Sequence, residues 1–130
     1  MYPAAAALDR WHAMIDAKDY AGLKDLLAED AVFESPVVHT PQVGKAITYK
    51  YLASAMTLLN NGTFEYLGEW RSDSSAILEF ACELDGIRVN GVDMIWWNDE
   101  GRITRFKVMV RPLKAINTLH QKMGELLAKA

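Results

Sequence analysis

The chain contains a single cysteine, Cys82, so an internal disulfide is impossible. One cysteine also excludes zinc sites built from four cysteines, or from two cysteines and two histidines. Of the three histidines, neither His12 nor His120 has a partner at a spacing typical of metal ligands. We therefore expect no metal ion and no cofactor.

Positive charge is not in excess, since 14 Lys and Arg residues stand against 17 Asp and Glu residues, for a net charge of −3. This balance argues against binding to nucleic acid or to an anionic membrane surface. No apolar run approaches the length that spans a membrane. The first residues, Met1-Tyr2-Pro3, lack the basic start and long apolar core of a signal peptide. We expect a cytoplasmic protein with no nucleic-acid or membrane partner.

With 130 residues, of which 51% are hydrophobic, the chain suits one domain with a sizeable core, and we expect a single domain over residues 1–130. Period-two alternation places Phe64, Tyr66 and Trp70 on one strand face. Helical spacing of apolar residues predicts helices near 8–15, 19–27, 47–59 and 113–126, and alternation predicts strands near 31–34, 64–71, 78–84, 87–97 and 102–110. Helices followed by successive strands are typical of an α+β fold with helices on one face of a curved antiparallel sheet.

An acidic residue interrupts the most apolar of these strands. Asp93 lies in the run Val-Asp-Met-Ile-Trp-Trp at 92–97, and alternation places it on the same face as Ile95 and Trp97. A carboxylate on an apolar face is costly unless it is protonated, paired or hydrogen-bonded. No basic residue close in sequence is placed to pair with it, so we expect a raised pKa for Asp93. It acts either as an acid, base or hydrogen-bond donor, or as a polar anchor for ligand or structure.

Three groups of residues support a family resemblance. They are Asp-Tyr-Ala-Gly-Leu at 19–23 with Leu-Leu-Ala-Glu-Asp-Ala-Val-Phe at 26–33, then Ser35-Pro36 with Pro41 and Gly44, and Gly-Val-Asp at 91–93 with Asp-Glu-Gly-Arg-Ile at 99–103. With these motifs, nearly the whole chain resembles the nuclear transport factor 2-like superfamily, in its SnoaL-like and ketosteroid isomerase-like branch. The resemblance implies a cone in which a strongly curved antiparallel sheet wraps around the N-terminal helices. It also implies a C-terminal helix and an enclosed apolar pocket.

A residue-by-residue comparison with ketosteroid isomerases retains one of three catalytic features. Ser35 occupies the position of the general base, and a serine hydroxyl cannot take a carbon-bound proton at neutral pH. Trp11 occupies the position of a tyrosine that donates to the oxyanion, and its indole N–H can only donate. Asp93 matches the protonated aspartate of the oxyanion hole. Limonene epoxide hydrolases are related, but Gly91 stands where that activity requires an arginine.

The resemblance and the strand alternation together predict the site residues. Asp93 and His39 are the candidate catalytic residues. His39 lies in a loop near the expected mouth, where it is either a general base or an ordinary surface residue. Cys82 also reads as a small core residue. The candidate ligand-binding residues are Trp11, Ile15, Phe33, Ser35, Tyr51, Leu52, Phe80, Cys82, Ile95, Trp97, Phe106, Val108 and Val110.

The opposite sheet face carries Val92, Met94, Trp96 and Met109, an apolar patch that predicts a homodimer. For function, we expect a protein that binds a small apolar or carbonyl-containing molecule. Its catalytic form would be an isomerase- or cyclase-type reaction on a small carbonyl or polyketide-like substrate, using Asp93. The alternative is a non-catalytic module of the same fold that binds a ligand or dimerises, because one fold hosts many functions.

Overall fold

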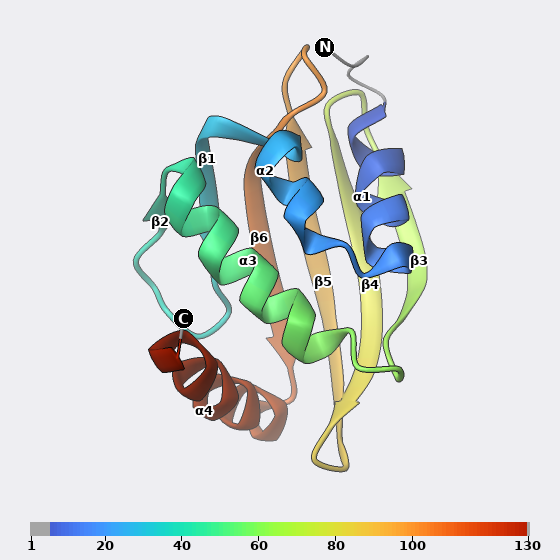
Figure 1. Ribbon diagram of the computed structural model, residues 1–130. Helices are drawn as coiled ribbons and strands as arrows, with labels where there is room; N and C mark the ends of the chain where they lie inside the picture. The colour runs from blue at the N-terminus through green and yellow to red at the C-terminus, as the bar shows by residue number, and fades with distance from the viewer. Residues whose placement is uncertain (1–5, 130) are drawn as a thin grey trace.

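The computed structural model describes residues 6–129, and Figure 1 shows its arrangement. Met1–Ala5, where no signal peptide is expected, and Ala130 lie outside the described residues. The elements are α1 (Ala6–Ala17), η1 (Tyr20–Gly22), α2 (Leu23–Leu26), β1 (Leu27–Glu34), β2 (Gln42–Val43), α3 (Lys45–Leu59), β3 (Glu65–Arg71), β4 (Ser75–Leu84), β5 (Ile87–Trp97), β6 (Ile103–Arg111) and α4 (Leu113–Lys129). Within residues 6–129, no helix combines the length and the hydropathy needed to cross a membrane.

The strands form one curved, unclosed sheet in the order β2-β1-β6-β5-β4-β3. In Figure 1, α1, α2 and α3 lie across one face of this sheet, and α4 lies beside the end of α3. The α+β class, the curved sheet and the C-terminal helix agree with the expectation from the sequence. One pairing differs from a wholly antiparallel sheet, because β1 runs parallel to β6.

The inner face of the sheet carries the core. Along β5, Asp93, Ile95 and Trp97 are buried while the residues between them are partly exposed, which confirms the predicted alternation. From the helical side, Trp11 is fully buried and its ring lies 4.8 Å from that of Phe106. Other predicted ligand-binding residues that are buried are Ile15, Phe33, Leu52, Phe80, Cys82 and Val108, whereas Tyr51 and Val110 pack against the core and are partly buried.

The expectation that Tyr66 and Trp70 share a face is wrong. The register between β3 and β4 shifts between Tyr66 and Gly68, so one extra residue enters the strand. Tyr66 lies opposite Phe80 on the inner face, whereas Trp70 lies opposite Ile77 on the outer face with 60% of its surface exposed. The same shift turns Glu69 towards α1, where it contacts His12.

Candidate functional site

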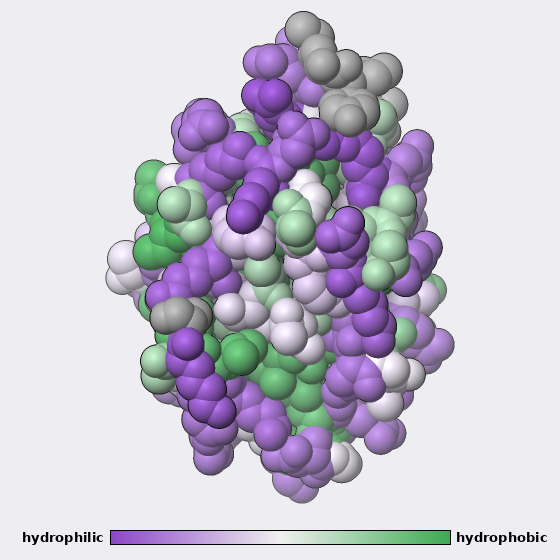
Figure 2. Space-filling view, viewed as in Figure 1, coloured by the Kyte–Doolittle hydropathy of each residue, from purple (hydrophilic) through white to green (hydrophobic). Residues whose placement is uncertain are grey.

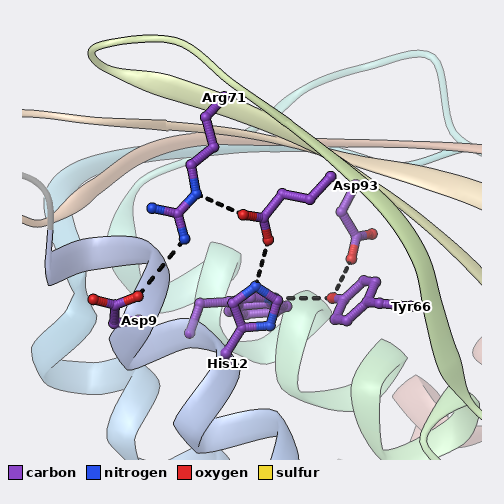
Figure 3. A network of polar contacts seen from close by, with 7 residues as sticks. Asp9, His12, Tyr66, Arg71 and Asp93 are labelled. Atoms are coloured by element: carbon purple, nitrogen blue, oxygen red, sulfur yellow. Dashed lines mark hydrogen bonds and ion pairs between the residues drawn. The ribbon is translucent and has the colours of Figure 1, made fainter.

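Asp93 is the buried acidic residue that the sequence predicts, with 3% of its surface exposed. Its carboxyl oxygen Oδ2 accepts a hydrogen bond from the Tyr66 hydroxyl at 2.7 Å. The Tyr66 oxygen in turn accepts a hydrogen bond from the Trp11 indole N–H at 2.9 Å. Figure 3 shows Tyr66 and Asp93 pointing towards one another. A chain of hydrogen bonds therefore runs from α1 through β3 to β5.

Burial sets the protonation of this pair. Removal from water raises the pKa of Asp93 to about 7, and the hydrogen bond from Tyr66 acts in the opposite direction with less effect. The pKa of Tyr66 is raised well above its ordinary value, first by burial and then by the neighbouring Asp93. Near neutral pH, Tyr66 therefore keeps its proton, and burial favours the neutral form of the Asp93 carboxyl.

A second polar group lies on the solvent side of Tyr66. His12 Nε2 lies 2.7 Å from Glu69 Oε1, and Arg71 donates to the other oxygen of Glu69 (Figure 3). The His12 ring packs edge-on against the Tyr66 ring, with 5.4 Å between centroids. His12 and the polar groups beside it therefore flank one side of the Tyr66 ring, away from Asp93.

Asp93 also lines a small, mostly enclosed cavity between the sheet, α3 and α4. The other lining residues are Phe33, Ser35, Pro36, Val37, Leu52, Ala55, Met56, Leu59, Val108, Leu119 and Met123. Of this lining, Asp93 and Ser35 alone carry polar side chains, and the Ser35 hydroxyl accepts a hydrogen bond from the Val37 N–H. In Figure 2, hydrophobic side chains gather on the nearby surface below the end of α3, next to α4.

The cavity is nearly filled by its own side chains. The space open to the centre of a water molecule is about 20 Å³, which is room for about one water. A ligand-sized pocket of the kind that the resemblance implies requires some of the lining side chains to move. Met56 and Met123 are suited to this because methionine has an unbranched, flexible side chain.

The predicted ligand-binding residues separate into two groups. Phe33, Ser35, Leu52 and Val108 line the cavity together with Asp93. The remaining members belong to the packed core around it or to its edge, outside that lining: Trp11, Ile15, Tyr51, Phe80, Cys82, Ile95, Trp97, Phe106 and Val110. The sequence therefore locates the buried face, and contact of these residues with a ligand stays a prediction.

His39, the second candidate catalytic residue, is not brought to Asp93. It is exposed and lines an open groove of about 620 Å³, together with Glu34, Arg105 and Lys107. This groove shares Ser35, Pro36 and Val108 with the lining of the cavity. Glu34 forms ion pairs with both Arg105 and Lys107 on the outer side of the sheet. The loop that follows β1 therefore presents His39 to this groove, and His39 is not among the residues that line the cavity itself.

Tyr66 is the residue at the site that reasoning from the sequence missed. The available signal was the alternation that places Tyr66 on the inner face of its strand, where a phenol can donate to a buried carboxylate. Partnership with Asp93 also requires the order of β3, β4 and β5 in the sheet, which alternation alone does not supply.

The chain belongs to the SnoaL-like domain family, whose model matches residues 8–106. It is similar to the crystal structure of a steroid delta-isomerase from Pseudomonas aeruginosa, with 38% identity and a TM-score of 0.91 over 97% of this chain and 92% of that chain. It is also similar to a bacterial protein with a cystatin-like fold from Silicibacter pomeroyi, with 26% identity and a TM-score of 0.83 over 92% and 83% of the two chains. An NTF2-like protein from Mesorhizobium loti shares the fold at 24% identity, with a TM-score of 0.72 over 84% and 91%.

No curated protein matches this sequence. The family match confirms the SnoaL-like resemblance seen in the sequence, and the similarity to a steroid delta-isomerase agrees with its ketosteroid isomerase-like branch. The NTF2-like neighbour confirms the expected fold.

Proposed function

We propose that this protein binds a small, mostly apolar molecule that carries a carbonyl oxygen, in the cavity between the sheet, α3 and α4. The observation that carries the proposal is the Asp93 carboxyl, which is buried yet lines an otherwise almost wholly apolar cavity. In its neutral form, Asp93 donates a hydrogen bond to the carbonyl oxygen. The similarity to a steroid delta-isomerase supports a ligand of this type.

The catalytic form of the proposal is an isomerase- or cyclase-type reaction in which Asp93 stabilises a developing oxyanion. Proton abstraction from carbon also requires a base, and Ser35 stands at the position where ketosteroid isomerases carry one. In the cavity lining, Asp93 is accompanied by no second ionisable side chain from residues 6–129. These features favour ligand binding with hydrogen-bond donation over the complete ketosteroid isomerase mechanism, and a non-catalytic binding module is the alternative.

The first prediction tests the hydrogen bond from Asp93. A suitable probe is the bicyclic ketone 1-tetralone, with tetralin as the hydrocarbon of the same shape, each titrated at pH 6 by thermal shift and calorimetry. A ligand present at 100 times its dissociation constant should stabilise the fold by about 2.7 kcal/mol. Asp93→Leu should lower the affinity for the ketone about tenfold and leave the affinity for tetralin unchanged, because the leucine cannot donate.

Asp93→Asn should retain most of the ketone affinity, since its amide N–H can replace the carboxyl proton. The matched control is Asp73→Asn, an exposed aspartate in the turn between β3 and β4. Equal preference for the ketone over tetralin in the native protein and in Asp93→Leu would contradict the proposal.

The second prediction concerns the outer face of the sheet. We propose that a second copy of the chain covers this face, because Trp70, Ile77 and Met94 are cross-strand neighbours there and Met109 is 53% exposed nearby. The same face carries Arg105 and Glu79, so opposite charges can meet across a two-fold axis. Such a patch is unusual on a monomer.

Met109→Glu should weaken this dimer by about 2 kcal/mol or more if the residue is central. Sedimentation velocity on micromolar protein should give twice the chain mass of 14.6 kDa for the native protein and a shift towards the single-chain mass for the variant. Leu113→Glu is the control, because Leu113 is 70% exposed at the start of α4, away from the sheet face. A native protein that sediments at 14.6 kDa would rule out the dimer.

A further inference from the structure

The direction of the hydrogen bonds around Tyr66 is fixed by Trp11. An indole N–H can donate but cannot accept. The Tyr66 oxygen, 2.9 Å from Trp11 Nε1, is therefore the acceptor of that bond. The Tyr66 hydrogen is left to point at Asp93 Oδ2, which lies 2.7 Å away.

This direction determines which oxygen of Asp93 holds the acidic proton. The line between the Tyr66 oxygen and Oδ2 has room for one hydrogen, and Tyr66 supplies it. A proton bound to Asp93 must then reside on Oδ1. Within residues 6–129, Oδ1 has no hydrogen-bond partner. Among these residues, Trp97 Nε1 is the one side-chain polar atom that is both fully enclosed and unpaired, so Oδ1 is not fully enclosed. Because Asp93 lines the cavity and Oδ2 is occupied by Tyr66, we infer that Oδ1 is the oxygen that faces the cavity.

We propose that Trp11 and Tyr66 are positioning residues, which hold the acidic proton of Asp93 on the oxygen that faces the cavity. This inference rests on the proposed function and adds an oriented donor to it. It also gives Trp11 a different role from the tyrosine at its position in ketosteroid isomerases. Trp11 and Tyr66 lie outside the cavity lining and act on the ligand through Asp93.

The surrounding contacts keep Tyr66 in this orientation. Phe64 packs edge-on against its ring at 5.0 Å, and His12 packs edge-on at 5.4 Å. The ionisable groups near the pair, His12 and Glu69, lie beyond Tyr66 on α1 and β3. The other elements around Asp93, namely α3, α4, β6 and the loop after β1, present apolar side chains and the neutral Ser35.

The experiment compares Tyr66→Phe and Trp11→Phe with the native protein. The ratio of affinities for 1-tetralone and tetralin is measured at pH 6, together with the Asp93 carboxyl titration by NMR in the absence of ligand. Tyr66→Phe should lower the ketone affinity about twofold to tenfold and leave tetralin binding unchanged, because the proton then divides between two oxygens. The pKa of Asp93 should rise in this variant, because a donor to the ionised form is lost.

Trp11→Phe should also reduce the preference for the ketone while retaining the Tyr66 hydroxyl, since the direction of its bond is no longer imposed. A purely structural role would lower the melting temperature of both variants and leave the ratio of the two affinities unchanged. If that result were found while Asp93→Leu lost its preference for 1-tetralone over tetralin, the positioning role would be overturned and the proposed function would stand. An unchanged ratio in Asp93→Leu as well would overturn the proposed function itself.

A measurement on the native protein provides a second test if the variants fold poorly. The infrared carbonyl band of bound 1-tetralone should shift to lower frequency below pH 7 and return above it, as the proton leaves Oδ1. A band that is independent of pH between 5 and 9 would contradict a proton directed at the cavity.

Discussion

Raising the pH from about 4 to about 8 is expected to cost the native protein on the order of 4 kcal/mol of stability that an Asp93→Asn variant retains. Burial raises the pKa of Asp93 from its ordinary value of 3.8 to about 7. Between these two values the folded protein holds a proton that the unfolded chain has released. The free energy of unfolding therefore falls as the pH rises through this interval and levels off above about pH 7.

Urea denaturation at pH 4.5 and pH 8 gives the change in the free energy of unfolding with pH for the native protein and for Asp93→Asn. The difference between these two changes measures the effect of Asp93. Contributions from other groups are shared by both proteins and cancel. Asp73→Asn should behave like the native protein, because Asp73 is exposed. Parallel profiles for the native protein and Asp93→Asn would mean that Asp93 is ionised in the folded state throughout this range.

The position and burial of Asp93 could be predicted from the sequence because a strand with one buried face imposes a period of two. Residues 87–97 keep that period without interruption, and the structure places Asp93, Ile95 and Trp97 on the buried face. The pKa shift has the expected direction for the expected reason, since no cation pairs with the carboxyl in residues 6–129.

The partner of Asp93 could not be predicted in the same way. Tyr66 reaches Asp93 across β4, and this contact depends on strand order and on the register shift between Tyr66 and Gly68. A single extra residue in a strand reverses the faces of all residues after it. Alternation therefore describes Phe64 and Tyr66 correctly and fails for Trp70.

His39 shows a further limit of the sequence. A loop between a strand and a short edge strand has no periodicity that fixes its side chains, and the expectation that His39 lies near the mouth of the pocket rested on the resemblance alone. In the structure, the loop presents His39 to the open groove beside Arg105 and Lys107, which borders the cavity at Ser35, Pro36 and Val108. The size of the cavity could not be predicted from the periodicity of apolar residues either, because it depends on how Met56 and Met123 pack.

Gly91→Ala is expected to destabilise the fold by about 3 kcal/mol, although it adds one methyl group. A Cβ atom at this position would lie 2.5 Å from the carbonyl oxygen of Met109 and 2.6 Å from Cζ of Phe80. The first contact is with the backbone of the neighbouring strand β6. The second is with a fully buried ring, so neither neighbour can move cheaply.

Gly124→Ala is the matched control, because a Cβ there meets no atom within 4 Å. It lies inside α4 and should stabilise the fold by up to about 1 kcal/mol through helix propensity. Urea denaturation of the two variants gives the comparison directly. Equal stability for Gly91→Ala and the native protein would mean that Phe80 does not occupy the space beside Gly91.

The Phe80 ring at Gly91 also connects this position to the site. Phe80 stacks on Phe64 at 5.3 Å, and Phe64 packs against Tyr66, which holds Asp93. Displacing Phe80 should therefore reduce the preference of Gly91→Ala for 1-tetralone over tetralin, in addition to its effect on stability. The same packing explains why an arginine at this position, as in limonene epoxide hydrolases, is incompatible with this chain: the ring of Phe80 already fills the volume that such a side chain would need.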